Sequence, residues 1–117
     1  MAFRIDIEKA TLQNNAYRKV INTTNQLQLV LMSLPPGDDI HLEVHKTTTQ
    51  FIRIEQGTGV AYVSGHKYLL KDGVSLVIPP NKRHFIKNTG KNVLKLYSIY
   101  SPPEHPKETL QKENPDK

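Results

Sequence analysis

Four polar residues in the middle of the chain have the types and the spacing of a metal site. Glu43 and His45 are separated by one residue, so on an extended strand both side chains project to the same side. Residues 46–49 allow the chain to turn back and bring Gln50 onto a neighbouring strand. His84 follows a Pro-Pro corner, from which a barrel could place it opposite the first pair. Two imidazoles, one carboxylate and one amide oxygen would suit a divalent first-row metal.

The four residues belong to two longer frames. The first is G-x5-E-x-H-x4-Q-x6-G and runs from Gly37 to Gly57, and the second is G-x5-P-x-N-x2-H-x3-N, from Gly73 to Asn88. These frames resemble the two conserved motifs of the cupin superfamily, whose usual forms are G-x5-H-x-H-x3–4-E-x6-G and G-x5-P-x-G-x2-H-x3-N. The resemblance implies a small single-domain cupin with metal ligands at Glu43, His45, Gln50 and His84.

Three positions depart from the usual cupin motifs. Glu43 replaces the first histidine, Gln50 replaces the glutamate, and Asn81 replaces a glycine, although Asn also tolerates unusual turn dihedrals. The site keeps two histidines and one carboxylate, similar to the facial triad of non-haem iron oxygenases. Gln50 either binds the metal through its oxygen or orients a bound water. A single carboxylate leaves positive charge on the metal, which suits an anionic or enolisable substrate.

The elements that must position these residues are short strands. Two-residue alternation and frequent turn signals predict strands at 27–32, 42–45, 51–55, 60–63, 67–70, 74–78, 85–86 and 93–100. This pattern is typical of an all-β barrel or sandwich. With the cupin resemblance, it predicts an antiparallel double-stranded β-helix of the jelly-roll kind. The first twenty residues are ambiguous and are interpreted as a strand and a turn.

The 117 residues suit one domain. We expect a cupin barrel over residues 1–106, with its motifs at 37–88. Residues 107–117 are rich in Pro, Lys and Glu and lack apolar periodicity, so we expect a flexible C-terminal tail. A small barrel has exposed edges, and pairing through an N-terminal strand would cover one of them, which predicts a homodimer.

Composition narrows the class of partner. The net charge is +5, but the basic residues are spread from Arg4 to Lys117 and the densest cluster is only Lys82-Arg83, which does not favour nucleic-acid binding. The absence of cysteine excludes disulfides and thiolate ligands. No apolar run is long enough to cross a bilayer and the first residues lack a secretory leader, so we expect a cytoplasmic protein without membrane contact.

The three other histidines are weaker candidates for a role in the metal site. His41 shares the strand face of Glu43 and His45, and we interpret it as a residue at the barrel mouth, with a ligand or proton-shuttle role as the alternative. His66 follows a turn, and His105 lies among prolines near the C-terminus. Both are expected at the surface.

The cupin resemblance indicates a fold more strongly than a reaction, because cupins include dioxygenases, isomerases, epimerases, decarboxylases, storage proteins and sugar-binding regulators. The leading hypothesis is a metal-dependent enzyme, dioxygenase-like or using Lewis-acid chemistry, that holds Fe, Mn, Ni or Zn and acts on a small anionic molecule. A second hypothesis is a small-molecule-binding or sensing cupin without turnover. A sugar-phosphate isomerase or epimerase ranks third, because the sequence identifies no dedicated second base.

Overall fold

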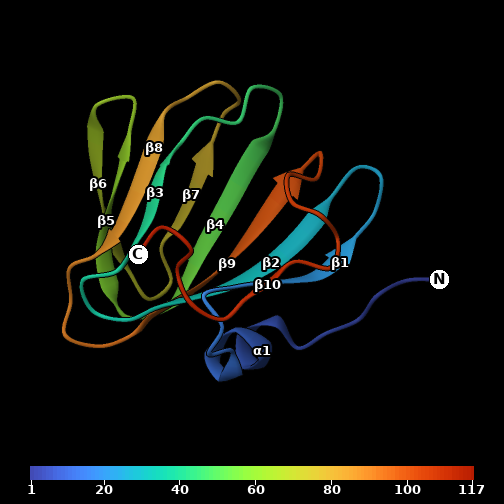
Figure 1. Ribbon diagram of the computed structural model, residues 1–117, viewed down its shortest axis with the longest axis horizontal. Coiled ribbons are helices and arrows are strands. Elements are labelled where there is room, and N and C mark those ends of the chain that lie inside the picture. Colours follow the sequence, from blue (N-terminus) through green and yellow to red (C-terminus); the bar gives the residue numbers. More distant parts are fainter.

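The computed structural model describes residues 1–117 and is built almost entirely of strands (Figure 1). Strands account for 49% of the residues and helix for 6%. The elements in chain order are α1 (Ile7–Gln13), β1 (Arg18–Thr23), β2 (Gln28–Leu34), β3 (Asp39–Glu43), β4 (Thr49–Gln56), β5 (Thr58–Val63), β6 (His66–Lys71), β7 (Ser75–Ile78), β8 (His84–Asn88), β9 (Leu94–Ser101) and β10 (Leu110–Gln111). This architecture confirms the predicted all-β double-stranded β-helix.

The strands form two antiparallel sheets that face each other (Figure 1). The first sheet has the order β10-β1-β2-β9-β4-β7 and the second the order β3-β8-β5-β6. Alternate residues of each strand point between the sheets, and these rows form the apolar core. The core members with no more than 1% exposure are Val30, Met32, Leu34, Ile52, Ile54, Ala61, Ile78, Ile86, Leu94, Leu96 and Tyr100.

The first twenty residues contain a helix that the sequence analysis did not predict. Helix α1 begins after Asp6, whose carboxylate accepts from the Lys9 amide at 3.2 Å, and it contacts β2, β4 and β9. Lys95 on β9 donates to the Leu12 carbonyl oxygen at 2.6 Å. A helix of seven residues shows too few turns for a clear apolar period, and the Asp6 N-cap is the local signal that could have predicted its start. This helix is too short and too polar to cross a membrane.

Residues 107–117 lie against the barrel, whereas the sequence analysis expected a flexible tail. Strand β10 pairs with β1, placing Leu110 opposite Lys19. The Asn114 side chain is 6% exposed and donates to a carboxylate oxygen of Asp38 at 2.7 Å and to the Asp39 carbonyl oxygen at 2.9 Å. Hydrogen bonds hold this segment, and a hydropathy pattern does not reveal such bonds.

Backbone conformation explains the residue types at two turn positions of the frames, Gly57 and Asn81. Gly57 has a φ of 92°, and a Cβ there would lie 2.8 Å from the Val93 carbonyl oxygen, so only glycine fits. Asn81 has a φ of 62°, as expected of a residue that replaces a glycine. The turn at Asn81 brings the chain into β8, which begins at His84.

Candidate metal centre

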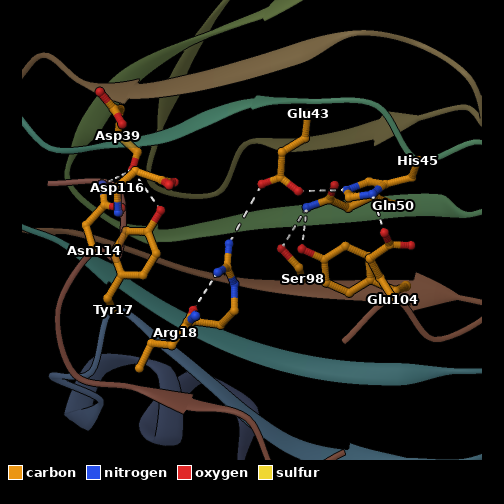
Figure 2. A network of polar contacts seen from close by, with 12 residues as sticks. Tyr17, Arg18, Asp39, Glu43, His45, Gln50, Ser98, Glu104, Asn114 and Asp116 are labelled. Carbon is orange, nitrogen blue, oxygen red and sulfur yellow. Dashed lines mark hydrogen bonds and ion pairs between the residues drawn. The ribbon is translucent and has the colours of Figure 1, made fainter. Parts of the chain in front are cut away.

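The four predicted ligands come together at one end of the barrel. Glu43 is the last residue of β3 and pairs in register with His84, the first residue of β8. His45 lies in the loop after β3, beyond the strand that was expected to include it, and Gln50 is the second residue of β4. The turn between them brings Gln50 back beside His45, as the spacing predicts (Figure 2).

Glu43, His45 and His84 are close enough to share one metal ion. Each offers a ligand atom, and these three atoms lie within 4.8 Å of one another. The two imidazole rings are 5.0 Å apart between centroids. His45 is 6% exposed and His84 is 1% exposed, so both side chains are shielded from solvent. Burial lowers the pKa of His84 and favours its neutral form, the form that binds metals.

Three of the four predicted ligands have a buried atom without a hydrogen-bond partner, namely Nε2 of His45, Nε2 of His84 and Oε1 of Gln50. The other polar atom of each side chain is engaged. His84 Nδ1 lies 3.1 Å from the Lys82 carbonyl oxygen, and Gln50 Nε2 donates to Ser98 at 3.3 Å and to Tyr100 at 3.1 Å. In His84 and Gln50, one polar atom is therefore held by the protein, and the other, His84 Nε2 or Gln50 Oε1, is available to bind a metal.

His45 lies between two carboxylates, one at each ring nitrogen. Its Nδ1 atom lies 2.9 Å from a Glu104 carboxylate oxygen, and its Nε2 atom lies 3.2 Å from a Glu43 carboxylate oxygen without forming a hydrogen bond. An imidazolium ring would donate to both carboxylates, whereas a neutral ring that donates to Glu104 would present its Nε2 lone pair on the side of Glu43. The neutral ring and the Glu43 carboxylate could then bind one metal ion together.

Arg18 adds a positive charge beside the cluster, and the sequence analysis did not identify it. The side chain comes from β1, is 7% exposed as a residue, and places Nη2 3.7 Å from a Glu43 oxygen. Its Nη1 atom donates to the Gln111 side-chain oxygen at 2.6 Å (Figure 2). The Nε atom is buried and has no partner. Nothing in the local sequence distinguishes Arg18 from other basic residues.

Of the three remaining histidines, two are exposed and one is partly buried, which differs from the prediction for His105. His41 is exposed on β3 and is not one of the clustered residues, and His66 is exposed as expected. His105 was expected at the surface, but it is partly buried, with its ring 5.1 Å from the Tyr100 ring. Burial, followed by the positive charge of Arg18, lowers the His105 pKa to about 4. The segment after β9 folds back over the site, which carries His105 inward.

Comparisons with known proteins agree with this fold. The chain is 42% identical to the uncharacterized protein YrkC of Bacillus subtilis over 97% of its own length and 64% of YrkC. It is 44% identical to a protein of Acanthamoeba polyphaga mimivirus over 87% of its own length and 66% of the relative. The chain thus spans about two thirds of the length of these curated relatives.

A solved structure is also similar over nearly the whole chain. The crystal structure of BH2720 from Bacillus halodurans has a TM-score of 0.94 and 37% sequence identity, covering 96% of this chain and 89% of that one. The family described as "Cupin domain" matches residues 30–100, a range that contains both motif frames and all four clustered residues. The match covers more than half of the sequence, and the chain therefore belongs to the cupin family.

Proposed function

We propose that this protein is a metal-dependent cupin that binds one divalent transition metal through Glu43, His45, Gln50 and His84. The observation that carries the proposal is the convergence of buried lone pairs that lack partners, on both histidines and on Gln50, around the Glu43 carboxylate. A buried acceptor without a partner costs about 1–3 kcal/mol. A bound metal ion would remove that cost from all of these atoms together.

The donor atoms suit Fe, Mn, Ni or Zn more than Mg or Ca, because two of the four are imidazole nitrogens. Such a metal would supply Lewis-acid catalysis or, with iron, oxygen activation. The protein's own part would be to orient the ligands and to exclude water. Ser98 and Tyr100 would hold the Gln50 amide so that its oxygen faces the metal, since both accept from its nitrogen.

Arg18 supports a small anionic substrate. A guanidinium group recognises carboxylates through fixed, charge-assisted hydrogen bonds, and this one is almost fully buried beside Glu43. Its free Nε atom retains one unused donor. A carboxylate or enolate that approached the metal would therefore meet two positive groups, the ion and Arg18. Cytoplasmic location and a homodimer remain expectations alongside this proposal.

A binding or sensing cupin without turnover is the second candidate. It is favoured by the contacts of both carboxylates near the centre, because Glu104 lies 2.9 Å from His45 Nδ1 and Glu43 lies 3.7 Å from Arg18 Nη2. Neither is free to act as an independent base. The same observation counts against a sugar-phosphate isomerase or epimerase, which would need a base to move a substrate proton.

Metal content tests the proposal. Protein loaded with Mn²⁺, Fe²⁺, Ni²⁺ or Zn²⁺ and then desalted should retain close to one ion per chain by elemental analysis. Glu43→Ala, His45→Ala and His84→Ala should each lose stoichiometric metal while keeping the β-type circular dichroism spectrum. His66→Ala is the matched control, because His66 is exposed. Full metal content in both the His45 and His84 variants would refute the site.

A further inference from the structure

Glu104 lies outside both motif frames, in the segment that follows β9, yet its carboxylate reaches the candidate metal centre. One carboxylate oxygen is 2.9 Å from His45 Nδ1, the ring atom away from Glu43 (Figure 2). An ionised carboxylate only accepts hydrogen bonds, so the contact with Glu104 requires a proton on His45 Nδ1. In the neutral ring, which is the form that binds a metal, the lone pair then lies on Nε2, the atom that faces Glu43 and has no partner.

We propose that Glu104 is a positioning residue that fixes the tautomer and the ring orientation of His45 for metal binding, and that Gln28 holds Glu104 in place. This inference rests on the proposed metal site and adds to it two residues from outside the motifs. A carboxylate behind a ligating imidazole also raises the basicity of that ligand.

Gln28 holds the backbone of the segment that carries Glu104. It belongs to β2, has no exposed surface, and stands opposite Tyr100 in the sheet. Its Oε1 atom accepts from the backbone amides of Glu104, at 3.2 Å, and His105, at 2.9 Å. Its Nε2 atom donates to the His105 carbonyl oxygen at 2.6 Å. Three hydrogen bonds from one rigid side chain therefore define where the Glu104 backbone lies.

Further contacts hold the rest of the segment. The Thr48 hydroxyl donates to the Pro102 carbonyl oxygen at 3.2 Å, and the Ser101 hydroxyl donates to the Gln26 carbonyl oxygen at 2.8 Å. The Tyr100 ring lies between two imidazoles, 5.1 Å from His105 and 5.7 Å from His45. The segment is thus fixed on both sides of Glu104, which suits a side chain that must hold a ring in one orientation.

The test compares Glu104→Ala with Glu104→Gln and a surface control. Glu104 is about one third exposed as a side chain, so its removal should leave the fold intact. Glu108→Ala is the control, because Glu108 is exposed and lies in the same segment. Nitrogen-15 NMR of the imidazoles in metal-free protein should show His45 protonated on Nδ1 in the wild type and in the control. Glu104→Ala should shift the proton towards Nε2, where Glu43 is the remaining acceptor, which loss of a merely structural contact would not produce.

Zn²⁺ affinity is the second measurement. Competition with a chelator should show about ten- to hundredfold weaker binding in Glu104→Ala, an intermediate loss in Glu104→Gln and none in the control. Gln28→Met, which keeps the length but not the hydrogen bonds, should move both readouts in the same direction as Glu104→Ala. An unchanged tautomer in Gln28→Met would overturn the assignment of Gln28.

The two measurements separate this inference from the proposed function. Wild-type tautomer and wild-type Zn²⁺ affinity in Glu104→Ala would overturn the positioning role, while metal loss in His84→Ala would still support the site. If the wild type bound no metal, the proposed function would fail. The tautomer in metal-free protein would then still decide whether Glu104 controls His45.

Discussion

The two ends of the barrel interior are built from the same strands but bury different chemistry. At one end, the inward rows of β2, β4 and β9 finish in the apolar residues Leu34, Ile54 and Leu94, none of which is exposed. At the other end, the same rows finish in polar residues that are almost equally buried, namely Gln28, Gln50 and Tyr100. The first end is a packed core, and the second surrounds the candidate metal centre.

Two buried amides show what this difference means. Asn88, at the apolar end, is 1% exposed, donates to the carbonyl oxygens of Leu34 and Asn92, and accepts from the Gly90 amide. Gln50, at the polar end, is also 1% exposed, but its oxygen has no partner. Satisfied buried groups stabilise a fold, and unsatisfied ones reduce stability unless a ligand completes them. The polar end is therefore organised for binding and the apolar end for stability.

The largest effect on stability is expected from Asn88→Ala. The substitution leaves the Leu34 carbonyl oxygen and other backbone groups of the β8–β9 connection without their partner. We expect the free energy of unfolding to fall by about 3 kcal/mol, which is roughly 10 °C in melting temperature. Asn92→Ala is the control, because the Asn92 side chain is exposed. Equal melting temperatures for the two variants would contradict the structural role of Asn88.

Removal of residues 107–117 should have the next largest effect, contrary to what composition suggests. It breaks the pairing of β10 with β1, the two hydrogen bonds of Asn114 and the bond from Arg18 to Gln111. We expect a loss of about 2 kcal/mol in unfolding free energy, measured by urea denaturation. An unchanged midpoint would restore the prediction of a flexible, dispensable tail.

The sequence predicted local structure well and distant contacts poorly. Alternation and turn residues located the strands from β2 to β9 but not β1 or β10, and the spacing between Glu43 and Gln50 predicted that both reach one site. Glu104 and Gln28, in contrast, are 76 positions apart and meet only because β2 and β9 are neighbours in the sheet. Arg18 and Gln111 likewise meet only in the folded chain. No local pattern reports such pairings, because they depend on sheet order.

His105, at the polar end, should make stability depend on pH. Burial and nearby positive charge lower its pKa to about 4 in the folded protein, whereas an unfolded histidine has a pKa near 6.5. Between these values the unfolded state binds more protons, so stability decreases as the pH falls from about 6.5 to about 4. His105→Phe should remove about 1 kcal/mol of this loss, allowing for the partial exposure of the ring.

Thermal melts of the wild type and His105→Phe across that pH range measure this difference. Subtracting the two curves removes the contribution of the carboxylates and of His84, which both proteins share. Parallel curves would show that His105 takes up its proton as readily in the folded protein as in the unfolded chain.

The smallest effect on stability, with the clearest effect on metal binding, is expected at Gln50. Gln50→Leu removes a buried acceptor that lacks a partner, but also the two hydrogen bonds that Nε2 donates to Ser98 and Tyr100, so the stability of the metal-free protein should stay within about 1 kcal/mol of the wild type. Gln50→Glu buries a carboxylate, and its desolvation should destabilise the metal-free protein although the hydroxyls of Ser98 and Tyr100 can donate to it. With metal bound, the order should reverse, because a charged oxygen binds the ion more tightly than a neutral one.

A purely structural role for Gln50 would not produce this reversal, so metal-loss rates and metal-free stability together test whether Gln50 binds the metal. Chelator-induced loss of Zn²⁺ should be slowest in Gln50→Glu, intermediate in the wild type and fastest in Gln50→Leu, while Gln50→Glu should be the least stable of the three metal-free proteins. Gln50→Leu should still bind metal, because Glu43, His45 and His84 remain. Gln50→Glu should also bind small anions such as azide more weakly, since the added charge offsets that of the ion. Identical chelation rates in all three proteins would place Gln50 outside the coordination sphere and reduce the site to three ligands.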